Sequence, residues 1–196
     1  MPALSPEMLE SGASTMVYDK DGKLVTQIGI RYSVPVDIKD VPEQVKNAFL
    51  SIEDPNFRNH HGISIRGIAR AAVKDIISRS KEEGGSTITQ QLVRISMLSP
   101  EKTIKRKIQE AILAIQVERR YTKDEILEMY LNNVYLGEGA YGIQAASQTY
   151  FGKTVDQLNL EEAALLGGLP QAPSAYSPFR DPEAAKARRS DVLDSM

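Results

Sequence analysis

From Val41 to the C-terminus, apolar residues recur every three or four positions, and this spacing favours a mainly helical fold. A helix with 3.6 residues per turn places such positions on one face, whereas a half-buried strand needs strict alternation. The residues of the first such face are Val41, Val45, Ala48, Phe49 and Ile52. Pro42 occupies a favoured first-turn position, so we predict a helix that ends in Glu53-Asp54-Pro55.

Capping signals predict where further helices begin. Ser64 precedes a regular apolar pattern that extends to Ile77, and a short helix is expected from Ser86 or Thr87. The later predicted starts are Ser99-Pro100 (a helix towards Arg120), the capping boxes Thr122–Glu125 and Asn159–Glu162, and Asp181-Pro182.

The N-terminal part has a different pattern. Residues 1–40 contain two extended segments around a turn at Asp21-Gly22, which predicts a small β-hairpin. We therefore divide the chain into an N-terminal β element, residues 1–40, and a helical domain, residues 41–196.

Composition is that of one globular domain and excludes several kinds of site. The chain has 196 residues, of which 41% are hydrophobic, and no cysteine, so disulfides, thiolate zinc sites and thiol nucleophiles are excluded. No run of apolar residues approaches the roughly 18 to 20 that a membrane span needs. The abrupt start and the apolar pattern at the C-terminal end suggest a piece of a longer protein.

Charge is distributed unevenly along the chain. The formal net charge of −2 argues against a nucleic-acid-binding protein, but residues 58–120 hold 13 Lys/Arg and 6 Asp/Glu, a local charge of +7. Such a segment would attract phosphates or acidic lipid headgroups. A solvated helix face is the more common cause of the same imbalance.

The first candidate site is Glu53-Asp54 at a predicted helix end, followed by a polar loop with His60-His61. The negative end of the helix dipole weakly opposes ionisation there, which suits a general base. By composition alone, ordinary surface acids are the simpler interpretation. Adjacent histidines point in different directions on most backbones, so a metal pair is disfavoured.

The second candidate is the glycine-rich start of the short helix, Gly84-Gly85-Ser86-Thr87, followed by Gln90-Gln91. Free amides and hydroxyls at a helix N-terminus can bind an anion, although the Gly-Lys-Ser/Thr ending of a nucleotide P-loop is missing. The paired glutamines beside an apolar face need partners, either in a structural network or in a substrate.

The third candidate is Glu110, which lies on a predicted helix with two apolar faces and is therefore expected in or beside the core. Arg106 stands four residues earlier on the same side of the helix and is the expected ion-pair partner. An ion pair that is only structural would also explain Arg106, and Lys105 and Lys107 could be solvated charge.

Together these candidates fit sugar transfer from a phosphate leaving group. A glycoside hydrolase also uses two carboxylates, one of which is protonated. A pyrophosphate leaving group needs positive charge instead, and the Lys/Arg residues beside Glu110 favour the transferase.

Four ordered motifs resemble the peptidoglycan glycosyltransferase domain (glycosyltransferase family 51) of class A penicillin-binding proteins and monofunctional transglycosylases. The matching motifs are Glu-Asp-x-x-Phe-x-x-His-x-Gly at 53–62, Gly-x-Ser-Thr-Ile-x-Gln-Gln at 84–91, Arg-Lys-x-x-Glu at 106–110 and Ile-Leu-x-x-Tyr-Leu-Asn at 126–132. Tyr150-Phe151-Gly152-Lys153 follows as the family pattern expects. The chain departs from the pattern at Arg94-Ile95, where the family usually has Lys-Asn.

The resemblance implies a lysozyme-like helical fold with a membrane-associated jaw lobe at about residues 63–99. It implies an enzyme on the extracytoplasmic face of a bacterial cell membrane, tethered by a transmembrane helix and often followed by a transpeptidase domain. Its expected partners are lipid II, the lipid-linked glycan chain and the membrane surface.

The resemblance also assigns roles to residues. Glu53 would be the general base, and Glu110 would act on the side of the pyrophosphate leaving group. The implied substrate-binding residues are Asp54, Phe57, His60, Ser86, Thr87, Gln90, Gln91, Arg94, Arg106 and Lys107. Mg²⁺ is a possible cofactor, with Glu110 as its candidate ligand. The alternatives are a muramidase on a similar fold and a non-catalytic module that binds glycan or lipid.

Overall fold

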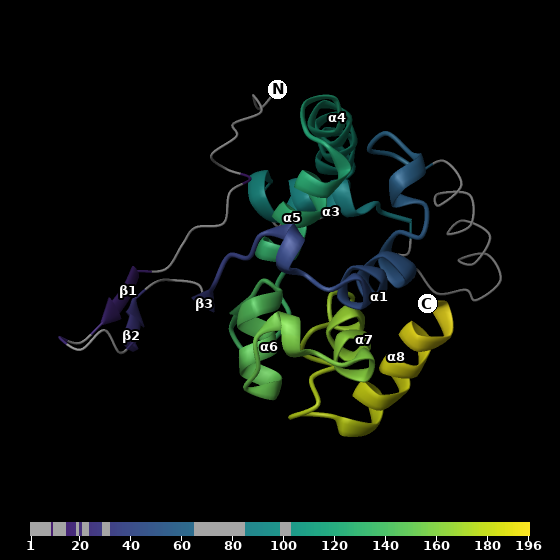
Figure 1. Ribbon diagram of the computed structural model, residues 1–196. Helices are drawn as coiled ribbons and strands as arrows, with labels where there is room; N and C mark the ends of the chain where they lie inside the picture. The colour runs from purple at the N-terminus through teal and green to yellow at the C-terminus, as the bar shows by residue number, and fades with distance from the viewer. Residues whose placement is uncertain are drawn as a thin grey trace.

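The computed structural model describes residues 9, 15–18, 20, 24–28, 32–64, 85–98 and 103–196. In this part the chain is mainly helical, as predicted (Figure 1). The α-helices are α1 (Glu43–Glu53), α3 (Ile88–Met97), α4 (Ile104–Arg120), α5 (Lys123–Asn133), α6 (Ile143–Phe151), α7 (Leu160–Gly168) and α8 (Pro182–Ser195). Short 3-10 helices occupy Ile38–Asp40, Phe57–Asn59 and Val155–Gln157. The helix predicted after Ser64 and most of the predicted jaw lobe lie outside the described residues.

Side-chain caps begin most of these helices where the sequence predicts them. Thr87, Thr122 and Asn159 each form a complete capping box, at α3, α5 and α7. Asp181 caps α8, in which Pro182 is the first residue.

The predicted start of α4 at Ser99-Pro100 is wrong. The backbone of Thr103 is extended, and its hydroxyl accepts a hydrogen bond from the Arg106 backbone N–H at 3.1 Å. This cap satisfies a first-turn donor, so the helix begins at Ile104.

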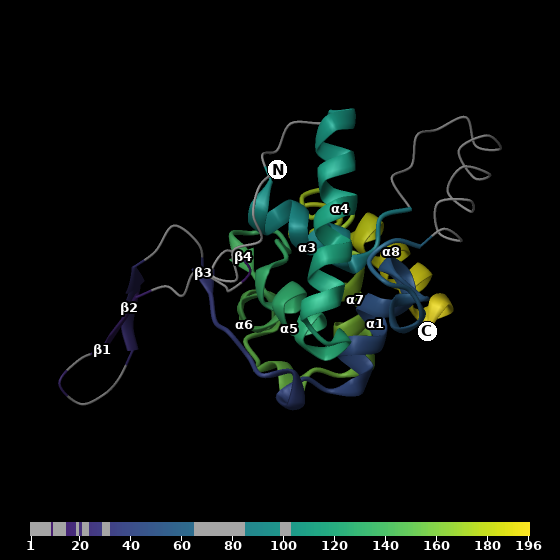
Figure 2. The ribbon, with the colours of Figure 1, turned by 90° about the horizontal axis from the view of Figure 1, so that it is seen from above.

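Two small sheets complete the described structure. β1 (Thr15–Tyr18) and β2 (Leu24–Ile28) form the predicted antiparallel hairpin, which lies apart from the helices in Figures 1 and 2. β3 (Tyr32–Ser33) pairs in parallel with β4 (Ala140–Tyr141), a contact that the sequence analysis did not predict.

The side chain of Asn132 on α5 attaches the segment after β3 to the helices. Its amide group donates to the Val36 carbonyl at 2.9 Å and accepts from the Val36 N–H at 3.0 Å. The Asn132 side chain thus satisfies both backbone groups of Val36, as a neighbouring strand would do, and it fixes the position of the chain shortly before α1.

The helices form two groups around a shared core. α1, α7 and α8 lie side by side, and α3 packs against α4 and α5 (Figures 1 and 2). Gly167 makes the first group possible, because a Cβ there would lie 2.8 Å from the Ala48 carbonyl oxygen of α1. Phe49 of α1 and Tyr130 of α5 meet edge to face, with ring centroids 6.4 Å apart. The C-terminal end of α1 therefore faces α3 and α5 at the centre of the molecule.

Candidate active site

Glu53 is the last residue of α1, and its carboxylate is held by α3. The amide nitrogen Nε2 of Gln91 donates to Glu53 Oε2 at 2.8 Å. Burial raises the pKa of Glu53 above its usual range, while the Gln91 hydrogen bond and the charges of Arg188 and Arg94 act in the opposite direction. The direction agrees with the sequence argument, and desolvation is the main cause of the rise in pKa.

Asp54 and His60 form a buried pair behind Glu53. The carboxylate oxygen Oδ2 of Asp54 accepts from the Ile88 backbone N–H at 3.0 Å and lies 2.8 Å from His60 Nε2. The other ring nitrogen, Nδ1, accepts from the Gly62 N–H at 3.2 Å, so Nε2 carries the proton and donates to Asp54. This pair therefore binds the polar loop to the first residue of α3.

Phe57 is buried beside this pair, and Lys123 Nζ lies 4.4 Å from its ring centroid. His61 is exposed, so the two histidines do not share a site, as the sequence analysis expected. Asp54, Phe57 and His60 thus have partners inside the protein, and their predicted contact with substrate stays a prediction.

The start of α3 is a closed network. Thr87 N–H donates to Gln90 Oε1 at 3.0 Å, Gln90 N–H donates to Thr87 Oγ1 at 3.1 Å, and the Thr87 hydroxyl donates to the Gly62 carbonyl at 2.7 Å. Thr87 and Gln90 are therefore structural partners of each other. Ser86 and Gln91, on either side of this cap, reach towards the two candidate carboxylates.

Glu110 on α4 is fully buried, as predicted, and has two cationic neighbours. Lys107 Nζ lies 2.7 Å from Glu110 Oε1 and also donates to Ser86 Oγ at 2.6 Å. Arg106 is farther away, with NH1 3.8 Å from Glu110 Oε2. The expected ion pair between Arg106 and Glu110 is therefore present, but Lys107 makes a shorter contact with the same carboxylate, and its predicted contact with a substrate stays a prediction. The Lys107 ammonium group is small enough to bond Glu110 and Ser86 together.

The segment from Ser86 to Gln91 consequently links the two carboxylates, Glu53 directly and Glu110 through Lys107. Its first residue contacts Lys107 and thereby Glu110, and its last residue contacts Glu53. Half-buried Arg94 lies one helical turn beyond Gln91 on the same helix. The structure thus brings together the three motifs that the sequence analysis considered separately.

Arg188 of α8 is a candidate that the sequence analysis missed. Its charge opposes the rise in the pKa of Glu53, and its Nε donates to the Gly168 carbonyl at 3.2 Å. Arg188 is 135 residues from Glu53 in a helix without a recognisable motif. No local pattern in the sequence could have identified it.

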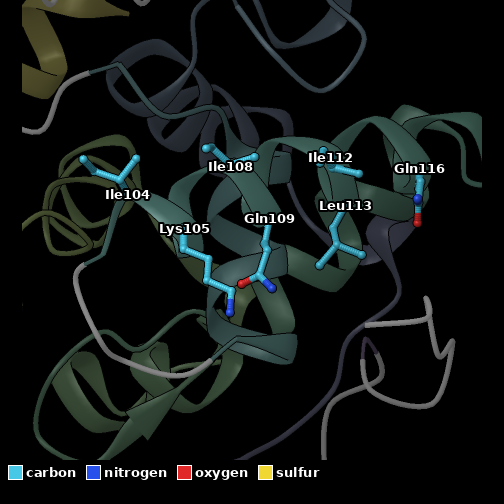
Figure 3. Close-up of a pocket in the computed structure, with 7 residues that line it drawn as sticks. All are labelled: Ile104, Lys105, Ile108, Gln109, Ile112, Leu113 and Gln116. Atoms are coloured by element: carbon cyan, nitrogen blue, oxygen red, sulfur yellow. The ribbon is translucent and has the colours of Figure 1, made fainter. Parts of the chain in front are cut away.

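The apolar face of α4 that carries Ile104 and Ile108 is exposed at its N-terminal end, which corrects the prediction that both apolar faces of this helix are buried. The exposed fraction is 83% for Ile104 and 56% for Ile108. These side chains border a groove of about 410 Å³, whose lining residues are drawn in Figure 3. On a helical wheel, Ile104 and Ile108 lie on the side of α4 away from Glu110. The groove is lined by Ile104, Lys105, Ile108, Gln109, Ile112, Leu113 and Gln116.

A resident metal ion does not fit the described side chains. The described residues contain no cluster of three or more His, Asp or Glu side chains, and Lys107 occupies one oxygen of Glu110. Glu110 Oε2 has no hydrogen-bond partner among these residues. One carboxylate oxygen fits only an Mg²⁺ ion whose other ligands are substrate phosphates and water.

Partly buried Glu53 thus lies at one end of the Ser86–Gln91 segment, and fully buried Glu110 with its two cationic neighbours lies at the other. The family model described as Transglycosylase matches residues 21–196, and the chain belongs to this family.

Curated relatives agree with this assignment. Penicillin-binding protein 1A of Escherichia coli is 50% identical over 92% of this chain and 21% of its own length. Penicillin-binding protein 1A of Aquifex aeolicus is 50% identical over 97% of this chain and 27% of its own length.

The crystal structure of penicillin-binding protein 1A from Haemophilus influenzae aligns with a TM-score of 0.49 and 27% identity, over 94% of this chain and 18% of that one. The chain thus spans about a fifth to a quarter of the length of these relatives. None of the helices in the described segments is long and apolar enough to cross a membrane.

Proposed function

We propose that this chain is a peptidoglycan glycosyltransferase domain that polymerises lipid II into β-1,4-linked glycan strands. The observation that carries the proposal is the Ser86–Gln91 segment, which holds Glu53 at one end and the Lys107–Glu110 pair at the other. An inverting displacement needs a base for the attacking hydroxyl on one side of the donor carbon atom and positive charge for the leaving group on the other.

Glu53 is the proposed general base. It takes the proton of the acceptor GlcNAc 4-hydroxyl while that oxygen attacks C1 of the lipid-linked donor glycan. Burial raises the pKa of Glu53, which makes its carboxylate a stronger base than an exposed one. The Gln91 hydrogen bond keeps the carboxylate oriented.

The cations beside Glu110 are the proposed stabilisers of the leaving group. As the new bond forms, the bond between C1 and the pyrophosphate oxygen breaks, and undecaprenyl pyrophosphate leaves with the electron pair. The configuration at C1 inverts from α to β. Lys107, Arg106 and Arg94 supply positive charge to the pyrophosphate. Glu110 holds the Lys107 ammonium group in place.

Mg²⁺ is proposed only as an ion that enters together with the substrate pyrophosphate. Glu110 Oε2 would be its protein ligand, and the ion would supply additional positive charge to the pyrophosphate. No step above depends on it.

The exposed apolar residues of α4 support a proposed position at the extracytoplasmic face of the bacterial membrane. Ile104 and Ile108, with Lys105 between them, combine apolar and cationic contacts suited to a lipid surface. They lie just after the predicted jaw lobe. A transmembrane tether and a transpeptidase domain are proposed for the longer protein, in line with the penicillin-binding names of its relatives.

Polymer synthesis tests the proposal. The purified chain is incubated with lipid II in detergent, and the products are separated by gel electrophoresis. Polymeric glycan is the expected product. Glycan shortened from purified sacculi would identify a muramidase instead, and lipid II binding without turnover would identify a binding module.

A further inference from the structure

A chain of two hydrogen bonds links the core of the molecule to Glu53. The Tyr130 hydroxyl donates to Gln91 Oε1 at 3.3 Å, and Gln91 Nε2 donates to Glu53 Oε2 at 2.8 Å. The three residues come from three helices, α5, α3 and α1. Gln91 is therefore held on both sides of its amide group.

The orientation of the Gln91 amide matters for the protonation of Glu53. An amide has an NH₂ group on one side and a carbonyl oxygen on the other, and rotation by a half turn exchanges them. The NH₂ group facing Glu53 stabilises the ionised carboxylate. The carbonyl oxygen facing Glu53 would repel that carboxylate and accept a proton from the neutral acid.

Tyr130 favours the first orientation. Its side chain is completely buried and packs edge to face against Phe49. Burial raises the pKa of Tyr130 well above its usual value, and the charge of Glu53 raises it further, so the hydroxyl stays a donor. Among the described residues, Gln91 is the hydrogen-bond partner of this hydroxyl. After rotation of the amide, the Tyr130 oxygen could accept from the NH₂ group, but the buried O–H donor would lose Gln91 Oε1, its acceptor among the described residues, which is costly.

We propose that Tyr130 is a positioning residue for Glu53, because its hydroxyl fixes the Gln91 amide with the NH₂ group towards the carboxylate. The proposal rests on the proposed function, in which ionised Glu53 is the base. Tyr130 lies beneath Gln91 and acts on Glu53 through it. The other charged groups that face Glu53 are Asp54 at the end of α1, Arg94 on α3 and Arg188 on α8.

The test measures the titration of Glu53 directly. The whole chain is labelled with ¹³C at glutamate side-chain carboxyls, and the Glu53 resonance is assigned by its loss in Glu53→Gln. Tyr130→Phe removes only the hydroxyl from a side chain that otherwise packs identically. We expect the Glu53 titration midpoint to move to higher pH in Tyr130→Phe, and an unchanged midpoint would overturn the proposal.

Three further variants separate positioning from loss of structure. Tyr150→Phe also removes a tyrosine hydroxyl hydrogen bond, in this case a half-buried one to the Leu136 carbonyl at 2.8 Å, and should leave the Glu53 midpoint in place. In Gln91→Ala the midpoint should rise, and Tyr130→Phe added to Gln91→Ala should move it no further. A shift of equal size in both backgrounds would show that Tyr130 acts without Gln91.

The pH profile of polymerisation gives a second measurement. Below the Glu53 midpoint, Tyr130→Phe should lower kcat about fivefold, the equivalent of one hydrogen bond, with a smaller effect at high pH and an unchanged KM. The NMR titration does not need turnover. A chain without polymerase activity would therefore contradict the proposed function, while the titration would still decide the role of Tyr130.

Discussion

In the proposed function, Glu53 combines two conflicting requirements, because the burial that would make it a stronger base also makes its ionised form unfavourable. The Gln91 hydrogen bond and the charges of Arg94 and Arg188 offset part of this cost. Such a conflict between activity and stability is expected at a functional residue.

Glu53→Gln should therefore abolish most polymerase activity. The substitution keeps the size of the side chain but removes the base, and we expect at least an approximately 10²-fold loss of rate, the lower range for general-base catalysis. Initial rates of lipid II polymerisation measure the loss, and lipid II binding should be retained. Near-normal turnover would remove Glu53 from the mechanism.

The same substitution should stabilise the fold at neutral pH. Because the pKa of Glu53 is raised on folding, the folded state holds more protons than the unfolded state at pH values above the unfolded pKa of 4.5. This contribution to stability is present at low pH and is lost as the pH rises through the folded pKa. Tm should thus be higher for Glu53→Gln than for the original chain at pH 7.5. The difference should shrink as the pH approaches 4.5, whereas a constant difference would indicate another cause.

The Lys107–Glu110 ion pair should contribute both to the stability of the fold and to polymerase activity. Lys107→Met removes the short partner of a fully buried carboxylate and leaves it with Arg106 at 3.8 Å. We expect the free energy of unfolding to fall by about 1–3 kcal/mol, because a buried charge loses its hydrogen-bond partner. Chemical denaturation measures the change.

A double variant distinguishes this cause from a loss of packing. Glu110→Gln added to Lys107→Met neutralises the stranded carboxylate and should recover most of the stability without recovering activity. If the double variant is as unstable as Lys107→Met, the ion pair is not what Lys107 contributes to the fold.

At the scale of elements, Gly62 sets how closely the polar loop approaches α4. Its φ is +90°, and a Cβ there would lie 2.8 Å from the Ala114 carbonyl carbon and oxygen. Ala114 is one turn after Glu110, and the Gly62 carbonyl accepts from Thr87. This glycine therefore joins the loop after Glu53, the start of α3 and the helix of Glu110.

Gly62→Ala should destabilise the chain by about 2–4 kcal/mol, since a left-handed backbone and a contact with fixed backbone atoms both oppose the methyl group. Gly139→Ala is the matched control, because its φ is +78° and nothing lies within 4 Å of the added Cβ. Gly139→Ala should lower the free energy of unfolding only through the strain of a left-handed backbone, by about 1–2 kcal/mol. Equal unfolding free energies for the two variants would contradict the role of close packing.

Elements whose causes are local could be predicted from the sequence. Thr87, Thr122, Asn159 and Asp181 each cap a helix through atoms three residues away, so the pattern contains both partners. The pairing of β3 with β4 depends on two-residue strands about a hundred residues apart, which no local pattern records.

The candidate site shows the same limit. The motifs identified Glu53, Gln91, Lys107 and Glu110, but spacing on a single helix favoured Arg106 as the partner of Glu110. Arg106 is indeed a partner of Glu110, but spacing did not reveal the shorter contact from Lys107, whose ammonium group also donates to Ser86 just before α3. Tertiary contacts of this kind also explain why Arg188 was missed.

At the scale of the whole molecule, the exposed apolar face of α4 should govern contact with lipid. Ile104 and Ile108 are exposed by 83% and 56%, and Lys105 adds positive charge beside them. Both isoleucines lie on the side of α4 away from Glu110, so their replacement should leave the carboxylate and its ion pair intact. Most of the predicted jaw lobe, to which the family resemblance assigns the membrane contact, lies outside the described residues.

The last prediction is that Ile104→Ser combined with Ile108→Ser lowers binding of the whole chain to anionic liposomes about tenfold. The reason is that apolar area buried in the interface is lost, at about 25 cal/mol per Å². Flotation with vesicles of phosphatidylglycerol and phosphatidylcholine measures the bound fraction. Leu160→Ser combined with Met196→Ser is the matched control, because these residues are also exposed, by 42% and 44%, but lie on α7 and at the C-terminal end. High salt should weaken binding of the original chain and of both variants, because the cationic contribution is screened. Unchanged binding of the α4 variant, or an equal loss in the control, would show that the membrane contact lies elsewhere on the molecule.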